Sequence, residues 1–270
     1  MNDLTLWRYL SHEKWEFLLR DKGIYFSKAS NFKDKKEGYY DVQDFYSSLK
    51  ELVPESIEVV NQAERLHQNI RDRSPDYNYI SCWQNMDDES ITMWKEYVPE
   101  SQEGVLIRTD VLSLLLNRPD SLSEIITGVN CKYYQGENDN CNEKYPFEFK
   151  ESKYSHEKEF RLILNSMKMQ VLTGFNPDGF CEVSTLNDKN EWLPFHQQFP
   201  PKNAASDILV KPEQGYVVKY PLEKIIHEIR VHPMASDLYL SKILADLIDV
   251  DIKCQVNRST ISPEAFNSNQ

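Results

Sequence analysis

Two short stretches near the N-terminus, Leu4-Thr-Leu-Trp-Arg-Tyr-Leu10 and Ile24-Tyr-Phe-Ser27, decide the fold of this chain. Both are rich in residues that favour β-strands. The segment between them has the signals of a helix: Ser11 can supply a capping oxygen, and the apolar residues Trp15, Leu18 and Leu19 share one helical face. Gly23 is expected to end this helix, because glycine tolerates left-handed backbone angles. The chain therefore opens with a predicted strand–helix–strand unit.

The remainder of the sequence interleaves short strands and helices without a regular βα alternation. Strands are expected at 77–83, 104–109, 129–133, 160–164, 216–219 and 225–231, and helices at 89–97, 111–117 and 237–248. Residues 41–73 read as two helices broken at Pro54, which is typical of a helical insertion. This irregular order predicts the α+β class. We expect one domain over residues 1–256, with a flexible polar tail at 257–270.

Composition narrows the classes of function. The 270 residues are 40% hydrophobic and carry a formal net charge of −12, so an extended contact with a nucleic-acid backbone is not expected. A compact phosphorylated ligand fits this charge better. Five scattered cysteines without CxxC spacing, and histidines without metal-ligand spacing, predict neither a disulfide framework nor a metal site. The chain shows no signal peptide and no apolar run of membrane length, which predicts a cytoplasmic protein without membrane contact.

The main chemical candidate is Ser155-His-Glu-Lys-Glu-Phe-Arg-Leu-Ile-Leu164. On a strand, Glu157, Glu159 and Arg161 would share one face, while Phe160 and the two leucines would pack on the core. Cleavage of an N-glycosidic bond develops an oxocarbenium ion, which a carboxylate beside the sugar can stabilise. A second carboxylate could orient the incoming nucleophile. The alternative is a half-exposed strand whose solvated face carries two acids screened by an arginine.

Four other residues are candidates for substrate contacts. Arg8 suits a diphosphate, because its planar guanidinium donates paired hydrogen bonds, and Ser27 could donate to a ribose hydroxyl. Trp94 and Tyr97 lie three residues apart on a predicted helix and could form a flat wall for a base. For each of these residues a purely structural role is the alternative: stacking for Arg8, a strand end for Ser27, and core packing for the aromatic pair.

The order of several motifs resembles the bacterial domain-of-unknown-function family 2971. The resemblance covers about residues 4–248 and rests on these pieces: Leu6-Trp-Arg-Tyr-Leu10, Ile24-Tyr-Phe-Ser27, Asn31-Phe32 with Glu37-Gly38, Ser81-Cys-Trp83, Ser90-Ile-Thr-Met-Trp94 with Tyr97, Gly104-Val-Leu-Ile107, Glu157-Lys-Glu-Phe-Arg161 and 226–233. Members often read Asn-Asp-Pro where this chain has Asn31-Phe32-Lys33-Asp34. The helical segment 41–73 corresponds to a variable insertion.

The opening unit and the late Glu-x-Glu are similar to the ADP-ribosyltransferase fold, which has a split sheet with flanking helices. That resemblance implies a site in which Arg8 contacts phosphate, Ser27 contacts ribose, Glu159 holds the ribose and Glu157 directs the acceptor. The family's Ser-Thr-Ser is replaced here by Phe26-Ser27-Lys28.

Two functional hypotheses follow from these motifs. The first is an enzyme that consumes NAD as a substrate, not as a cofactor, and transfers ADP-ribose to a protein, a nucleic acid or water, as a bacterial toxin or an antiviral defence effector would. The second is a non-catalytic binding or regulatory module that uses the same scaffold to contact a protein partner.

Overall fold

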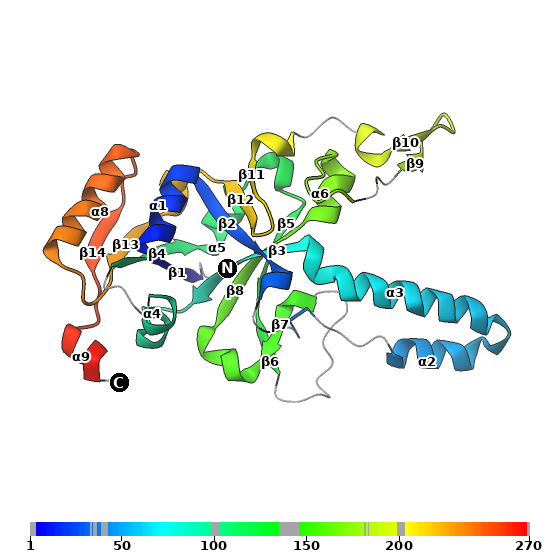
Figure 1. The fold of residues 1–270 in the computed structure, drawn as a ribbon, viewed down its shortest axis with the longest axis horizontal. Coiled ribbons are helices and arrows are strands. Elements are labelled where there is room, and N and C mark those ends of the chain that lie inside the picture. Colours follow the sequence, from blue (N-terminus) through cyan, green and yellow to red (C-terminus); the bar gives the residue numbers. More distant parts are fainter. Residues whose placement is uncertain are drawn as a thin grey trace.

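One large mixed sheet organises the protein (Figure 1). The computed structural model describes residues 4–32, 34, 37–38, 43–98, 103–134, 146–180, 182, 184–198 and 203–268. The strands of this sheet are β1 (Thr5–Ser11), β2 (Gly23–Lys28), β3 (Asn78–Asn85), β4 (Gly104–Asp110), β5 (Ile126–Asn130), β8 (Glu159–Asn165), β11 (Ile208–Lys211), β12 (Gly215–Lys219), β13 (Glu228–Val231) and β14 (Gln255–Arg258). Adjacent strands of this sheet are antiparallel, except for β13 and β14, which are parallel.

The sheet forks at β3. One edge of β3 pairs with β8 along its length. The other edge pairs first with β2, through Ser27↔Ile80, and then with β1, through Trp7↔Gln84. The described pairings on this second edge leave out residues 81–83. The sheet therefore divides into one arm with the order β1-β4-β13-β14 and another with the order β2-β12-β11. We call this division the fork. The mixture of helices and strands expected from the sequence is present, with most of the strands in one large mixed sheet.

Seven α-helices of the described residues lie around the sheet. They are α1 (His12–Asp21), α4 (Ile91–Tyr97), α5 (Val111–Leu116), α6 (Ser166–Thr173), α7 (Leu222–Ile225), α8 (Asp237–Asp249) and α9 (Pro263–Ser268). Short strands β9 (Ser184–Leu186) and β10 (Trp192–Pro194) form one hairpin, while β6 (Lys132–Tyr134) and β7 (Phe149–Glu151) form a small parallel pair. None of the described helices has the length and apolar content needed to cross a membrane.

The opening strand–helix–strand unit is present, but its helix ends differently from the prediction. Ser11 occupies the capping position without a side-chain hydrogen bond, and Lys22, not Gly23, adopts the left-handed angle that stops α1. Gly23 begins β2, where a Cβ atom would lie 2.3 Å from the carbonyl oxygen of Val218. Glycine is therefore required at this position because β12 passes close by.

The two largest apolar clusters of the described residues lie on the sheet. The larger contains the predicted apolar side of β8 (Phe160, Leu162 and Leu164), packed with residues of β1, β2, β4 and α8. The smaller lies under α4 and includes Trp7, Tyr9 and Trp94. Burial of this apolar area supplies most of the favourable free energy of folding.

The predicted helical insertion is a hairpin of α2 (Gln43–Leu52) and α3 (Ile57–Tyr77), joined by a turn of 3-10 helix at Pro54–Ser56. It projects away from the sheet (Figure 1). The break at Pro54 is confirmed, and α3 runs past Arg73 to Tyr77. Residues 41 and 42 of the expected segment lie outside the described residues. Tyr46, Leu49, Val53 and Val60 pack the two helices together.

The C-terminal segment differs from the expected flexible tail. Residues 255–258 form β14, which pairs with β13, and α9 follows. Ile261 and Phe266 pack against the cluster under α4. Two predicted strands also change. The strand expected at 129–133 spans the end of β5 and part of β6, and the strand expected at 225–231 begins only at Glu228, because Ile225 ends α7.

Candidate functional site

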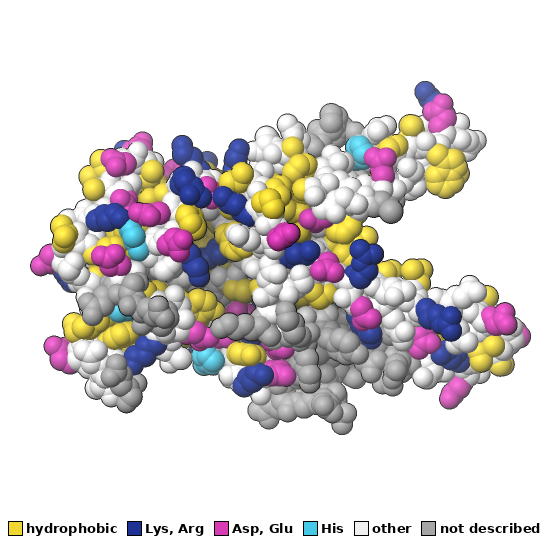
Figure 2. Space-filling model, in the orientation of Figure 1, with side chains coloured by type: hydrophobic (Ala, Val, Ile, Leu, Met, Phe, Trp, Pro, Cys, Tyr) yellow, Lys and Arg dark blue, Asp and Glu magenta, His cyan; other side chains and the backbone are white. Residues whose placement is uncertain are grey.

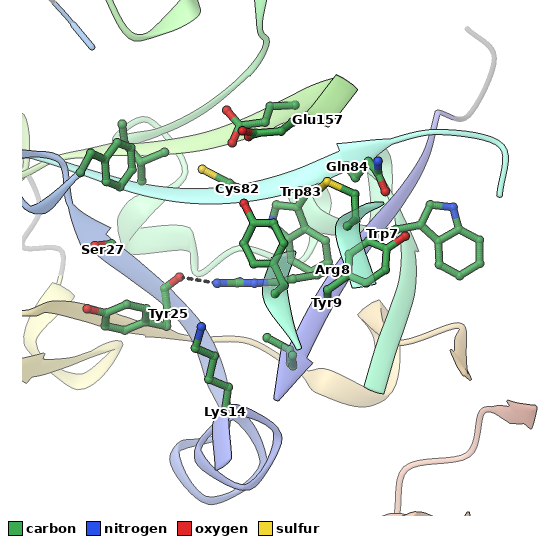
Figure 3. A pocket seen from close by; sticks show the side chains of 16 residues that line it. Trp7, Arg8, Tyr9, Lys14, Tyr25, Ser27, Cys82, Trp83, Gln84 and Glu157 are labelled. Atoms are coloured by element: carbon green, nitrogen blue, oxygen red, sulfur yellow. Dashed lines mark hydrogen bonds between the residues drawn. The ribbon is translucent and has the colours of Figure 1, made fainter. Parts of the chain in front are cut away.

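A pocket of about 270 Å³ lies at the fork, between β1, β2, β3, α1, α4 and the start of β8 (Figure 3). Its charged and hydroxyl-bearing lining residues include Arg8, Lys14, Ser27, Tyr97, Glu157 and Glu159. The pocket therefore brings together five of the seven residues predicted from the sequence, namely Arg8, Ser27, Tyr97, Glu157 and Glu159. The other two, Trp94 and Arg161, do not line it.

Arg8 spans the fork. Its Nη1 donates to Ser81 Oγ at 2.8 Å, and its Nη2 donates to the carbonyl oxygen of Tyr25 at 3.1 Å. The guanidinium carbon lies 5.2 Å from the centre of the Trp83 ring. Arg8 therefore links β1 to the Ser81 side chain of β3 and to the backbone of β2 at the fork.

The end of the pocket near Arg8 is cationic. Burial lowers the pKa of Arg8 to about 10. Burial, followed by the nearby Arg8 charge, also lowers the pKa of Lys14. Neither side chain forms an ion pair with an acidic side chain of the described residues. Two neighbouring cations that lack acidic partners make this end suited to an anionic group.

The opposite end of the pocket carries two carboxylates, and their local structure differs from the prediction. Glu157 ends a 3-10 helix, Ser152–Glu157, and only Glu159 belongs to β8. Lys158 between them has a left-handed backbone with φ of 42°, so the strand alternation assumed for 157, 159 and 161 does not hold. Both carboxylates still reach one cation: Lys150 Nζ lies 2.7 Å from Glu157 Oε2 and 3.4 Å from Glu159 Oε1.

Arg161 lies beneath Glu159. Its Nε donates to Glu159 Oε2 at 2.7 Å, its Nη1 to the carbonyl oxygen of Phe147 at 3.0 Å, and its Nη2 to Glu37 Oε2 at 3.1 Å. Arg161 is 0% exposed and Glu159 is 5% exposed. The prediction of Arg161 as a substrate contact is therefore wrong, and so is the alternative of a solvated charged strand face. Arg161 instead holds Glu159 in place.

We call Glu37, Lys150, Glu157, Glu159 and Arg161 the site cluster; all five are buried. With three acids and two bases, it carries one negative charge in excess when every member is ionised. Burial and the Glu159 charge raise the pKa of Glu157 to about 7. Burial alone would raise the pKa of Glu159 as well, but Arg161 and Lys150 outweigh it and hold that pKa at about 2. Of these two acids, Glu157 is therefore the one whose pKa is raised, and Glu159 is the one that Arg161 and Lys150 keep ionised.

Aromatic side chains form part of the wall, but Trp94 is not among them. Trp94 is 0% exposed; its Nε1 donates to Glu89 Oε2 at 2.8 Å, and its ring meets Tyr9 edge-on at 5.0 Å. Its predicted role as a stacking surface is therefore wrong, and the core-packing alternative is correct. Trp83 and Tyr97 line the pocket instead.

Ser27 lines the pocket from β2, where its Oγ makes one long contact, 3.5 Å, to the carbonyl oxygen of Lys28. Two further lining residues, Trp83 and Gln84, carry the buried polar atoms Nε1 and Oε1, which have no hydrogen-bond partner within the described part of the chain. A buried polar atom of this kind costs free energy unless water or a ligand satisfies it.

Several site residues escaped the sequence analysis. Lys14, Glu37 and Lys150 come from separate segments. Only Glu37 belongs to a motif named above, Glu37-Gly38, and that motif carried no site role. Lys150 follows the segment 135–145 and reaches the carboxylates only through the fold. In the sequence, Lys150 is recognisable only as a polar residue next to the apolar Phe149, a pattern that fits a short strand. That pattern does not predict an ion pair with a carboxylate.

Among the residues that the structure describes, one group of side chains has atoms close enough to hold a metal ion. Ligand atoms of Glu96, His156 and Glu157 all lie within 4.8 Å of one another. Glu96 and His156 are exposed and lie 3.5 Å apart as a possible ion pair, while Glu157 is bonded to Lys150. We assign no metal role to this group.

Comparisons of the chain with protein-family models, with curated proteins and with solved structures find no match. Function must therefore be argued from the pocket itself.

Proposed function

We propose that this protein cleaves the nicotinamide–ribose bond of NAD and transfers ADP-ribose to an acceptor. One observation carries the proposal: Arg8, Ser27 and Glu159, from three distant segments, line one pocket that is cationic at one end and acidic at the other. A ligand with a diphosphate beside a ribose matches this distribution of charge.

In this proposal the cationic end binds the diphosphate. Arg8 and Lys14 supply the positive charge. The pocket volume of about 270 Å³ is slightly below the range for ligand sites, about 300–1,000 Å³. The pocket would therefore hold the nicotinamide ribose and part of the diphosphate, with the adenosine outside. Ser27 Oγ would donate to a ribose hydroxyl.

The acidic end would support bond cleavage. As nicotinamide leaves, positive charge develops on the ribose, and the permanently ionised Glu159 stabilises that charge. Glu157, with a pKa of about 7, would accept the proton of the attacking hydroxyl or water. Lys150, bonded to both acids, keeps them at the same wall of the pocket.

The wider identity belongs to the same proposal. The motif order supports membership of the bacterial family 2971 and a relation to ADP-ribosyltransferases, with Phe26-Ser27-Lys28 as the departure from the usual motif. A role as a toxin or an antiviral effector, acting on a protein, a nucleic acid or water, is consistent with NAD consumption.

Titration calorimetry with NAD, followed by measurement of released nicotinamide, tests this function. Glu159→Gln is expected to abolish release and Arg8→Ala to weaken binding at least about tenfold. Glu223→Gln, an exposed acid on α7, is the matched control and should behave as wild type. Circular dichroism must show that each variant is folded. If the wild-type protein neither binds NAD nor releases nicotinamide, the proposal is wrong.

A second candidate function is favoured by the enclosure of Glu159. Because Arg161 and Lys150 already neutralise this carboxylate, the pocket could bind a phosphorylated ligand or support contact with a protein partner without turnover. NAD binding that depends on Arg8, with no nicotinamide released at any pH, would identify this binding module instead of the enzyme.

A further inference from the structure

The side-chain amide of Gln84 is buried at the pocket with hydrogen-bonding capacity to spare. Gln84 is 2% exposed and lines the pocket. Its Oε1 accepts no hydrogen bond from the described residues, and its Nε2 donates to Met86 Sδ at 3.1 Å. Because a thioether sulfur is a weak acceptor, both the oxygen and the nitrogen of this amide have capacity left for a ligand.

The strand register places Gln84 next to the acid of the proposed reaction. In the antiparallel ladder between β3 and β8, Gln84 is directly opposite Glu159. On the other edge of β3 it is opposite Trp7 of β1. Side chains of directly opposite residues share one face of a sheet, with Cβ atoms about 5 Å apart. The free amide and the Glu159 carboxylate therefore belong to the same wall of the pocket.

The lining around Gln84 is mainly apolar and aromatic. It includes Trp7, Tyr9 and Met93 of the cluster under α4, together with Tyr97, which packs against that cluster. Figure 3 shows Gln84 on the same side of the pocket as Trp7 and Tyr9. Such surroundings suit a planar, uncharged ring, with Gln84 as the polar group that fixes its orientation.

We propose that Gln84 recognises the carboxamide group of the nicotinamide ring and selects the amide form of the dinucleotide over its carboxylic acid form. This inference rests on the proposed function. A primary carboxamide carries an N–H donor beside a carbonyl acceptor, so it can donate to Gln84 Oε1 and accept from Gln84 Nε2. Rotation about the last side-chain torsion of Gln84, whose preferences are broad, turns the amide from Met86 toward the ring.

The acid form of the dinucleotide should be rejected for two reasons. Its carboxylate has no N–H to donate, so Gln84 Oε1 would stay buried without a partner. Its negative charge would also lie beside the site cluster, which already carries surplus negative charge. Sites built to hydrogen-bond an N–H group discriminate strongly against analogues that lack it. We therefore expect the wild-type protein to bind NAD at least about a hundredfold more tightly than nicotinic acid adenine dinucleotide.

Titration calorimetry with the two dinucleotides tests the role of Gln84. Gln84→Met keeps the length of the side chain but removes both hydrogen bonds. It should weaken NAD binding about tenfold and reduce the preference for NAD over the acid form to less than about tenfold. Gln62→Met is the matched control, at an exposed position of the α2–α3 hairpin, which projects from the body of the protein (Figure 2). It should keep the wild-type dissociation constants, and circular dichroism must show that both variants are folded.

A third dinucleotide tests the hydrogen bond to Gln84 Oε1 in the wild-type protein. An acetyl group in place of the carboxamide keeps the carbonyl acceptor and lacks the N–H donor, so binding should be about tenfold weaker than for NAD. Equal dissociation constants for the three dinucleotides would overturn the role of Gln84 and leave NAD cleavage as the proposed function. A folded Gln84→Met variant that keeps the full preference for NAD would also overturn it. Absence of binding to all three would refute the proposed function and this inference together.

Discussion

Two charged clusters in this protein have the same formal composition but different surroundings. The site cluster, beside the pocket, joins three glutamates to Lys150 and Arg161. The second, which we call the tail cluster, joins Asp88, Glu89 and Glu228 to Arg108 and Arg230 near the C-terminal segment. Each contains three acids and two bases.

The two clusters differ in how the surrounding groups stabilise their surplus negative charge. In the tail cluster, neutral donors surround the most buried acid: Glu89 accepts from Trp94 Nε1 at 2.8 Å, from Ser259 Oγ at 2.6 Å and from Thr260 Oγ1 at 2.7 Å. Hydrogen bonds and arginine charges outweigh burial and lower the pKa of Asp88 and Glu228. In the site cluster, burial instead raises the pKa of Glu37 and Glu157. The acids of the tail cluster, which holds the C-terminal segment, are stabilised in the ionised form by their hydrogen-bond donors and arginines. The site cluster, beside the pocket, contains a carboxyl group whose raised pKa allows it to exchange a proton.

Removing the central cation of the site cluster should have the largest effect. Arg161→Met leaves the buried acids Glu37 and Glu159 with Lys150 as their one remaining cation in the site cluster. We expect a loss of about 4 kcal/mol in the free energy of unfolding, measured by chemical denaturation. Lys132→Met, which breaks an ion pair whose lysine is 61% exposed, is the control and should cost less than about 1 kcal/mol. An equal loss of unfolding free energy in the two variants would show that the buried ion pairs of Arg161 contribute no more to stability than the exposed pair of Lys132.

Acid should destabilise the region of the tail cluster through His232. Burial lowers the pKa of this histidine from 6.5 to about 4, so its contribution to stability is complete above pH 6.5 and is lost as the pH falls through 4. This shift corresponds to about 3 kcal/mol. His232→Phe keeps the ring packing against Trp94 and Phe266 and should remove that part of the acid dependence in denaturation series. His156→Gln, at an exposed histidine, should not.

Weakening the tail cluster should release the C-terminal segment without changing the pocket. Glu89→Gln removes a charge bonded to Arg230 and one acceptor for the donors of residues 259–260, and we expect a loss of about 2 kcal/mol. Hydrogen exchange should accelerate in residues 255–268 and stay unchanged in β3 and β8. Equal acceleration in all these segments would mean that the cluster supports the whole fold.

The smallest change in stability is expected at Glu157. Its pKa is raised from 4.5 to about 7, so its stabilising effect is complete below pH 4.5 and is lost as the pH rises through 7. Glu157→Gln should alter stability by only about 1 kcal/mol at pH 8, because it removes surplus negative charge but also weakens the hydrogen bond that Lys150 donates to this side chain. Denaturation between pH 5 and pH 8 should show a flatter profile in the variant. Parallel profiles would contradict the assigned protonation.

Much of the fold could be predicted from local patterns. The strand–helix–strand opening, the helical break at Pro54 and the apolar alternation of 160, 162 and 164 all reflect short-range physics that a single sequence displays. The C-terminal segment was mispredicted, because the contacts that hold it are with distant parts of the chain: β14 pairs with β13, and Ser259 bonds to Glu89, 170 positions away. Hydrogen bonds between residues so far apart produce no periodic pattern in the sequence.

The site could be predicted only in part, because some of its residues stand out in the local sequence and others do not. Arg8, Ser27 and the two glutamates stand out as chemistry-bearing residues on or beside predicted strands. Lys150 and Glu37 do not, since a lone lysine or glutamate in a polar stretch looks like surface. Trp94 and Arg161 were predicted to contact the ligand because their side chains are chemically able to do so. Only the folded structure shows that both point away from the pocket and into the protein interior.

The left-handed residue between the two pocket acids restricts how the chain can change. At φ of 42°, Lys158 resets the direction of the chain, so that a turn of helix and a strand deliver their terminal carboxylates to the same ammonium group. Proline, with φ fixed near −65°, is barred from that position, while glycine or asparagine is permitted. Related chains that build this wall in the same way should therefore be recognised by a residue tolerant of positive φ between the acids, and not by an unbroken strand.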